Sequence, residues 1–183
     1  MRNPLLPEVT DADLHAQYQF GRIVRDRTEQ ANQAVIEIRR VKAQVEDRLT
    51  RATDRQLTAA AGTLRTNASA VEQNVYQVKN QSGQDPLNFP VRLNNRIAAL
   101  NGVVASGPYG PTAQSQQVFA ELSTALGVQL TQLKKVFDTD LKRFNDELQK
   151  LGLAPIVPKA EEKPATRPAP VMDDDLTGEV VPQ

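Results

Sequence analysis

The chain has 183 residues, with 22 Lys plus Arg balanced by 22 Asp plus Glu, no cysteine, no tryptophan and 4% aromatic residues. The balanced charge disfavours nucleic acid as a partner, and the lack of cysteine excludes disulfides, thiolate metal ligands and cysteine nucleophiles. No stretch approaches the ~18 apolar residues of a membrane span. The opening "MRNPLLPEVT" has no apolar signal-peptide core, so neither a span nor a signal is predicted.

A first long helix is predicted for residues 11–49, in a stretch without proline from Thr10 to Lys79. Its apolar or small residues recur at steps of three, four or seven, which is typical of a helix packed in a bundle. Thr10 with Asp13 has the spacing of a helix cap. The stripe consists of Leu14, Gly21, Val24, Thr28, Ala31, Val35, Ile38, Val45 and Leu49.

A second helix is predicted for residues 54–81, after a turn at 50–54. A single helix over 10–80 would be ~105 Å long and would leave much of its apolar seam in water. Thr53 with Gln56 has capping-box spacing and is expected to begin the second helix. The seam of this helix consists of Leu57, Ala61, Leu64, Ala68, Val71, Val75 and Val78.

The stretch "SGQDPLNF" at 82–89 interrupts the helical pattern, and we interpret it as a structural corner. Gly83 is expected to end the second helix with a positive φ. Asp85 is expected to act as a cap, and Pro86 fits the first turn of a helix.

The third helix is predicted for residues 90–106, starting at Pro90, which disfavours helix at the residue before it. Leu87 and Phe89 are expected to be apolar pegs that enter the core from the corner. Asn94 lies beside the apolar face of this helix. Its amide either braces unpaired backbone groups of the corner or contacts a ligand.

The last helix is predicted for residues 112–151, with Thr112 as N-cap and Gly152 as the stop. Six of the twelve prolines fall in the last 29 residues, so 154–183 is predicted to be a disordered tail. The apolar stripe of this helix consists of Phe119, Leu122, Leu126, Leu130, Leu133, Phe137, Leu141, Phe144, Leu148 and Leu151.

These elements predict an all-α protein, an antiparallel four-helix bundle with long helices. The predicted organisation is an N-terminal extension at 1–10, a helical bundle at 11–153 and the disordered, proline-rich tail at 154–183.

Nothing in the sequence points to catalysis, a cofactor or a metal. His15 is the only histidine, and we interpret it as solvated or locally paired, because a metal or catalytic role needs convergent partners. The nine basic residues between 11 and 55 are matched by eight acidic ones, which is typical of a mixed solvated helix face. The acidic run 173–175 lacks the spaced ligands of a calcium loop.

The string "YQVKNQSGQDPLNFPVRLNNRIAAL" lies between "DLHAQYQFGRIVRDRTEQANQAVIEIRRVK" and "GPTAQSQQVFAELSTALGVQLTQL". Together they resemble the C-terminal helical region of large bacterial sortilin-like β-propeller proteins. These carry BNR (Asp-box) repeats and are often labelled glycosyl hydrolase or exo-sialidase-like. The resemblance runs from about Asn3 to Ile156, and "RNPLLPEVTDADL" resembles the end of the preceding β-sandwich. It implies a common origin and a helical fold. The resembled family is usually exported, but no signal is predicted in this chain, so its localisation is left open.

The resemblance carries no catalytic motif, and no Ser-x-Asp-x-Gly-x-Thr-Trp type box occurs in this sequence. The favoured hypothesis is therefore a non-catalytic helical scaffold or interaction module. Its expected partner is a protein: a propeller or β-sandwich part, or a second copy of the chain. The alternative is an accessory domain or fragment of a glycosyl hydrolase-like protein whose active site lies elsewhere.

Overall fold

The computed structural model describes residues 8–80, 82–84 and 87–158. These residues form α1 (Asp11–Arg51), α2 (Arg55–Val75), α3 (Leu93–Val104), α4 (Ala113–Val136), the π-helical turn η2 (Phe137–Leu141) and α5 (Lys142–Lys150). No strand occurs among the described residues. The predicted all-α class is confirmed.

The first turn separates α1 from α2 at residues 52–54, close to the predicted position. Thr10 caps α1 as expected, in a capping box with Asp13. The predicted cap of α2 was wrong by one residue. Asp54, not Thr53, is the N-cap, and its Oδ1 accepts hydrogen bonds of 2.8 Å from the backbone N–H groups of Gln56 and Leu57.

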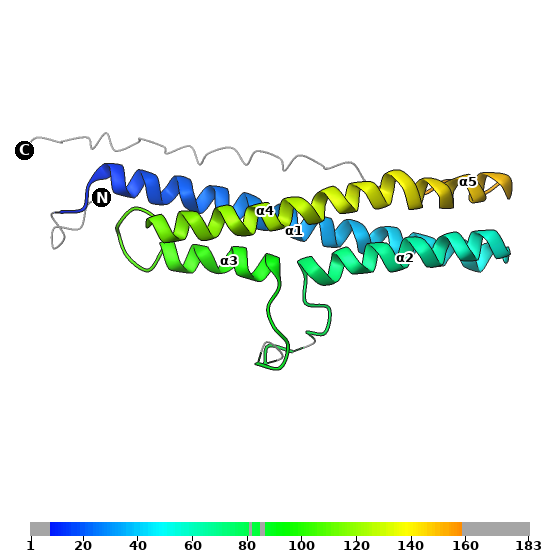
Figure 1. Cartoon of the computed structure of the whole chain (residues 1–183), viewed down its shortest axis with the longest axis horizontal. Helices are drawn as coiled ribbons and strands as arrows, with labels where there is room; N and C mark the ends of the chain where they lie inside the picture. Colours follow the sequence, from blue (N-terminus) through cyan, green and yellow to red (C-terminus); the bar gives the residue numbers. More distant parts are fainter. Residues whose placement is uncertain (1–7, 81, 85–86, 159–183) are drawn as a thin grey trace, which may run out of the picture.

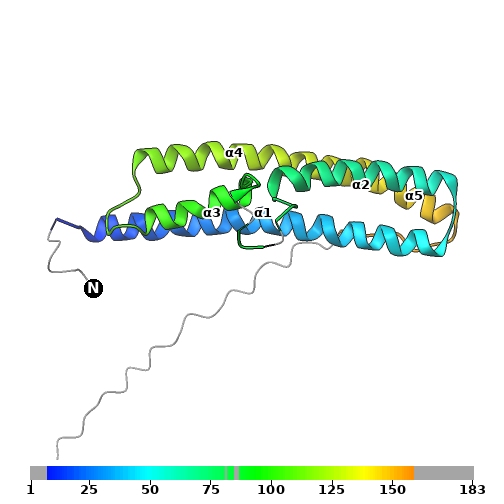
Figure 2. The ribbon, with the colours of Figure 1, turned by 90° about the horizontal axis from the view of Figure 1, so that it is seen from below.

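The second and third helices lie end to end rather than side by side. Figures 1 and 2 show α2 and α3 in line along the bundle, both antiparallel to α1 and to the α4–α5 helix. The C-terminal half of α1 packs on α2, and its N-terminal half packs on α3. The fourth helix, α4, contacts both α2 and α3. The antiparallel bundle of four helices therefore has a cross-section of three helices, because α2 and α3 share one position.

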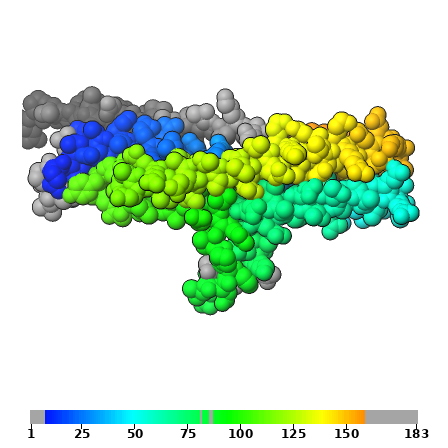
Figure 3. Space-filling view, in the orientation of Figure 1, coloured from blue at the N-terminus to red at the C-terminus, as the bar shows by residue number. Residues whose placement is uncertain are grey.

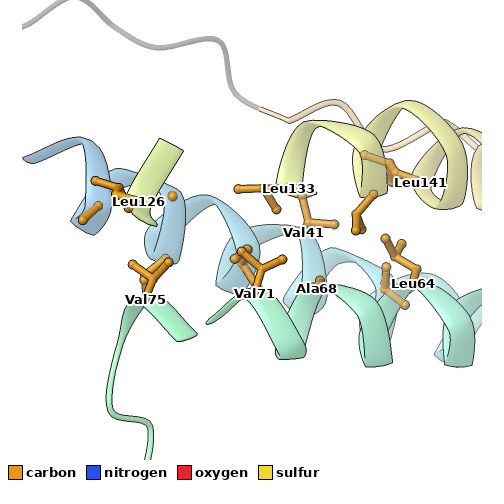
Figure 4. Packing of buried hydrophobic residues seen from close by; sticks show 14 of the residues in the cluster. Val41, Leu64, Ala68, Val71, Val75, Leu126, Leu133 and Leu141 are labelled. Atoms are coloured by element: carbon orange, nitrogen blue, oxygen red, sulfur yellow. The ribbon is translucent and has the colours of Figure 1, made fainter. Parts of the chain in front are cut away.

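The core follows the predicted seams. In Figure 4, Val41 of α1, Val71 and Val75 of α2, Leu126 and Leu133 of α4 and Leu141 of η2 lie around a shared interior. Val78, the last residue of the predicted second seam, lies beyond α2 and is 39% exposed. The seam therefore ends three residues before the sequence pattern does.

The fourth helix runs almost without a break from Ala113 to Lys150, with one π-helical turn in the middle. Thr112 is its N-cap, and Gly152 follows its end with a φ of 69°, as the sequence predicted. A π turn contains one more residue than an α turn, so η2 changes the face that the following residues present. Asp140 of η2 accepts a 2.7 Å hydrogen bond from Nδ2 of Asn67 in α2.

The folded part continues past the predicted boundary at 153. Ile156 is 1% exposed and belongs to the core. Its backbone N–H and C=O are both bound by the side chain of Asn145. We call residues 153–158 the C-terminal strap. Residues 154–156 thus belong to the bundle, and the rest of the predicted tail, from 159 on, lies outside the described residues.

Within the part of the chain that the structure describes, no helix is both long and apolar enough to cross a membrane.

Candidate functional site: the projecting loop

The segment between α2 and α3 projects sideways from the bundle. We call residues 76–92 the projecting loop. Figures 1 and 3 show it as a protrusion at the point where α2 ends and α3 begins. The second helix ends at Val75 and the third starts at Leu93, so the loop is longer at both ends than the predicted corner at 82–89.

A buried glutamine closes the base of this loop. Gln77 is 4% exposed. Its Nε2 donates a 2.8 Å hydrogen bond to the carbonyl oxygen of Pro90, and its Oε1 accepts one of 3.2 Å from the backbone N–H of Lys79. The two ends of the loop are therefore tied together by one side chain.

An ionic cluster lies behind the start of the loop, between α1 and α2. The side chain of Glu72 is 6% exposed, and its two oxygens lie 2.6 Å from Arg39 Nε and 3.1 Å from Lys42 Nζ. Lys42 Nζ also donates a 2.9 Å hydrogen bond to Ser69 Oγ. Two cations thus neutralise a carboxylate that would be costly to bury alone, and the Ser69 hydroxyl holds one of these cations in place.

The same cluster fixes the first residue of the loop. The backbone N–H of Tyr76 donates a 2.8 Å hydrogen bond to the carbonyl oxygen of Glu72. The Arg39 guanidinium lies 4.8 Å from the centre of the Tyr76 ring, within range of a cation–π interaction. Arg39 therefore contacts both the buried carboxylate of Glu72 and the ring of Tyr76, the first residue after α2.

The outer part of the loop carries exposed apolar side chains. Leu87 is 88% exposed, Val91 45% and Val78 39%. The Phe89 ring is half-buried, and Lys79 Nζ lies 5.5 Å from its centre. The base of the loop is thus polar and buried, and its outer part exposes apolar side chains among polar ones such as Ser82, Gln84 and Asn88.

Several predicted roles in the corner are wrong. Gly83 does not have a positive φ, because Gly152 is the only described residue that does, and α2 already ends at Val75. Leu87 is not a peg in the core. Phe89 reaches only a half-buried position, and α3 starts three residues after Pro90. Asp85 and Pro86 lie outside the described residues, so their predicted roles stay predictions.

Asn94 is buried, but it does not brace the loop. Its Nδ2 donates a 3.3 Å hydrogen bond to Oδ1 of Asn32 in α1, and its own Oδ1 has no partner within the described part of the chain. The bracing amide is that of Gln77. Sequence reasoning missed Gln77 because it lies inside the predicted second helix, where a polar residue beside the seam is ordinary.

The remaining candidates are local surface features. His15 is exposed, and its Nε2 lies 3.5 Å from Nε2 of Gln19. The Thr10 hydroxyl and backbone N–H lower the pKa of Asp13, as expected for a capping carboxylate. Among residues 8–80, 82–84 and 87–158, no group of three or more acidic or histidine side chains is placed to hold a metal ion.

Comparison of the chain with protein-family models, with curated proteins and with solved structures gives no match in any of the three. The resemblance to the helical region of BNR-repeat proteins therefore stays a prediction from the sequence.

Proposed function

We propose that the chain is a non-catalytic helical scaffold that presents the projecting loop to a protein partner. The observation that carries this proposal is the loop itself, whose base is tied together by Gln77 and which exposes the apolar side chains of Leu87, Val91 and Val78. Surface apolar groups gathered on one protrusion are a common mark of a protein interaction site.

The base supports recognition because it limits the freedom of the loop before any partner binds. Gln77 joins the loop ends, and Arg39 holds Tyr76. A partner then has to order less of the chain on binding, which favours affinity. Leu87, with 88% of its surface exposed, is the side chain with most to gain from burial.

The sequence resemblance provides a partner class for this proposal. It favours a β-propeller or β-sandwich part of a sortilin-like, BNR-repeat protein, and self-association is the other option. In the glycosyl hydrolase-like alternative, this chain would hold such a part in place, and the catalytic residues would lie on that part.

A photo-crosslinking residue at position 87 tests the proposal in cells that express the chain naturally. The matched control carries the same residue at position 128 in α4, where Val128 is also exposed, at 61%. We expect a discrete crosslinked protein from position 87 that is absent from position 128, and mass spectrometry would identify it. Equal or no crosslinking at both positions would contradict the proposal.

Leu87→Ser then separates recognition from a structural role. Because Leu87 makes little contact with the bundle, we expect the unfolding free energy to stay within ~0.5 kcal/mol of wild type. Affinity for the crosslinked partner should fall. A loss of stability without a loss of affinity would instead assign Leu87 to the fold.

A further inference from the structure

The C-terminal strap lies in a slot between α1 and α5 that has the chemistry of a peptide-binding site. Asn145 of α5 donates from Nδ2 to the carbonyl oxygen of Ile156, at 2.7 Å, and accepts at Oδ1 from its backbone N–H, at 2.8 Å. An asparagine amide presents a donor and an acceptor side by side, as a peptide group does. The contact therefore recognises backbone and is independent of the side chain.

Two further contacts select the segment that fits. Arg48 Nε donates a 3.1 Å hydrogen bond to the carbonyl oxygen of Ala154, two residues before Ile156. The Ile156 side chain is 1% exposed in the core, whereas Ala154 and Pro155 are exposed. The slot thus accepts an extended segment with an apolar residue other than proline at the position of Ile156, and a proline before that residue favours the extended backbone at Ala154. Proline itself is excluded at the position of Ile156 because it has no N–H to donate to Asn145.

The same pattern occurs once more, fifteen residues further along the chain. Ala154-Pro155-Ile156-Val157 is matched by Ala169-Pro170-Val171-Met172. By this match, Ala169 would offer the carbonyl oxygen for Arg48, Pro170 would be the preceding proline, and Val171 would offer an N–H and a β-branched side chain one methylene smaller than isoleucine. Residues 169–172 lie outside the described part of the chain.

We propose that the slot is a peptide-binding site for Ala-Pro-apolar segments, and that Ala169–Met172 replaces the strap when the strap is released. The resident strap has the shorter tether to α5, and it holds the slot in this structure. The cost of closing a longer loop rises only slowly with its length. The second segment is therefore a competitor somewhat weaker than the strap, and its exchange with the strap would move the point at which the tail leaves the bundle by fifteen residues.

Spin labelling tests the exchange directly, because the chain has no native cysteine. The label is placed by Met172→Cys, and the readout is broadening of the Asn145 side-chain amide signals in the NMR spectrum. We expect weak broadening with the native strap and strong broadening when Ile156→Ser weakens it. Adding Val171→Ser, the matched control, should abolish the broadening. Strong broadening that persists with Val171→Ser, or no broadening in Ile156→Ser, would overturn the proposal.

A peptide titration keeps the test valid if Ile156→Ser fails to fold. Full-length protein carries a spin label through Val157→Cys, a position that is 72% exposed on the strap. A synthetic peptide of residues 166–174 should displace the strap and raise the mobility of the label. The same peptide with Val171→Pro lacks the N–H for Asn145 and should have no effect. Equal effects of the two peptides, or none from either, would contradict a site that recognises this pattern.

The two possible sources of the bound segment are the same chain and a second copy. Mixing isotopically labelled protein with unlabelled protein that carries the residue 172 label distinguishes them. Broadening only within one chain assigns the exchange to that chain, and broadening in the mixture assigns it to a second copy. Each result supports the same slot and the same segment.

Discussion

The buried polar side chains lie where helices begin, end or change partner. Among the described residues, Glu72, Gln77, Asn94 and Ser115 are the buried polar ones. Glu72 and Gln77 bracket the end of α2, and Ser115 lies in the first turn of α4, where its N–H donates to Thr112 Oγ1 at 3.1 Å. Buried polar groups need hydrogen bonds, and helix ends supply groups that need partners.

The cap of α2 allows a test between two adjacent residues. We expect Asp54→Ala to lower the unfolding free energy by ~0.5–2 kcal/mol, because two backbone N–H groups lose their acceptor. Thr53→Ala, the control, removes the residue that the sequence pattern favoured. It should change stability by less than ~0.5 kcal/mol, because Thr53 is exposed and is not the cap.

Urea denaturation followed by circular dichroism measures both variants. If Thr53→Ala proves the more costly substitution, α2 begins with the capping box that the sequence indicated, and the geometry at Asp54 does not determine stability.

At the scale of elements, two interruptions set the shape of the bundle. The projecting loop divides one helical layer into α2 and α3, and η2 divides the other into α4 and α5. The first interruption removes residues from the layer entirely. The second adds one residue to a turn and rotates the next face by about 100°, one residue's share of a 3.6-residue turn. Leu141 at the end of η2, and Phe144 and Leu148 after it, all reach the core.

Deleting one residue from η2 tests whether the π-helical turn exists because the sequence has one residue more than a regular α-helix needs here. Thr139 is exposed and donates to the carbonyl oxygen of Lys135. We expect its deletion to convert η2 to α-helix and to keep the face of α5, with a loss of about 1 kcal/mol for the hydrogen bond.

The matched control deletes Thr63, which is also exposed and donates to a carbonyl oxygen four residues earlier, that of Ala59. In α2 no extra residue is present to be absorbed. Leu64 and the valines after it would turn out of the core, at roughly 1.5–3 kcal/mol for each large apolar side chain. Thermal unfolding compares the two deletions, and equal losses would contradict the account of η2.

The ends of α2 and α3 illustrate which features the sequence does not determine. The 4-3 seam continues through Val75 to Val78, and Gly83 offers a strong local stop. The helix nevertheless ends at Val75. Two long-range contacts hold the chain after that point: the Tyr76 ring with Arg39 of α1, and Gln77 with the carbonyl oxygen of Pro90. Local propensity is a weak guide where such contacts compete.

The seams of the first, second and last helices and the caps at Thr10 and Thr112 could be predicted, because each depends on residues close in the sequence. The turn between the first two helices could be predicted because one unbroken helix would leave its apolar seam in water. The roles of Leu87 and Asn94 could not be. From sequence alone, an apolar residue in a loop is expected to lie in the core unless the direction of the loop is known. That direction depends on where α2 and α3 pack against α1.

The longest helix, α1, gives the bundle its length. With 41 residues it spans about 60 Å. Among the described helices, α2, α3 and α4 contact it. The C-terminal strap adds the last piece of core, through Ile156.

Two truncations test the contribution of the strap. A chain that ends at Pro158 should keep the helix content and the unfolding free energy of the full chain. A chain that ends at Gly152 loses the Ile156 side chain from the core and should be less stable by about 1.5–3 kcal/mol. Chemical denaturation of the two forms gives the difference. Equal stability would mean that Ile156 contributes nothing net to the fold.

The bond between Gln77 and Pro90 has a consequence for the architecture of larger proteins. It holds the two ends of the projecting loop together at the surface of the bundle, so the residues between them form a loop with closely spaced ends. Surface loops with close ends are the positions that accept inserted domains, and lengthening such a loop costs little free energy. A guest domain whose own termini lie close together, inserted between residues 82 and 84, should therefore fold beside the bundle without disturbing it. The bundle can therefore serve as a scaffold that carries an inserted domain at the middle of its length.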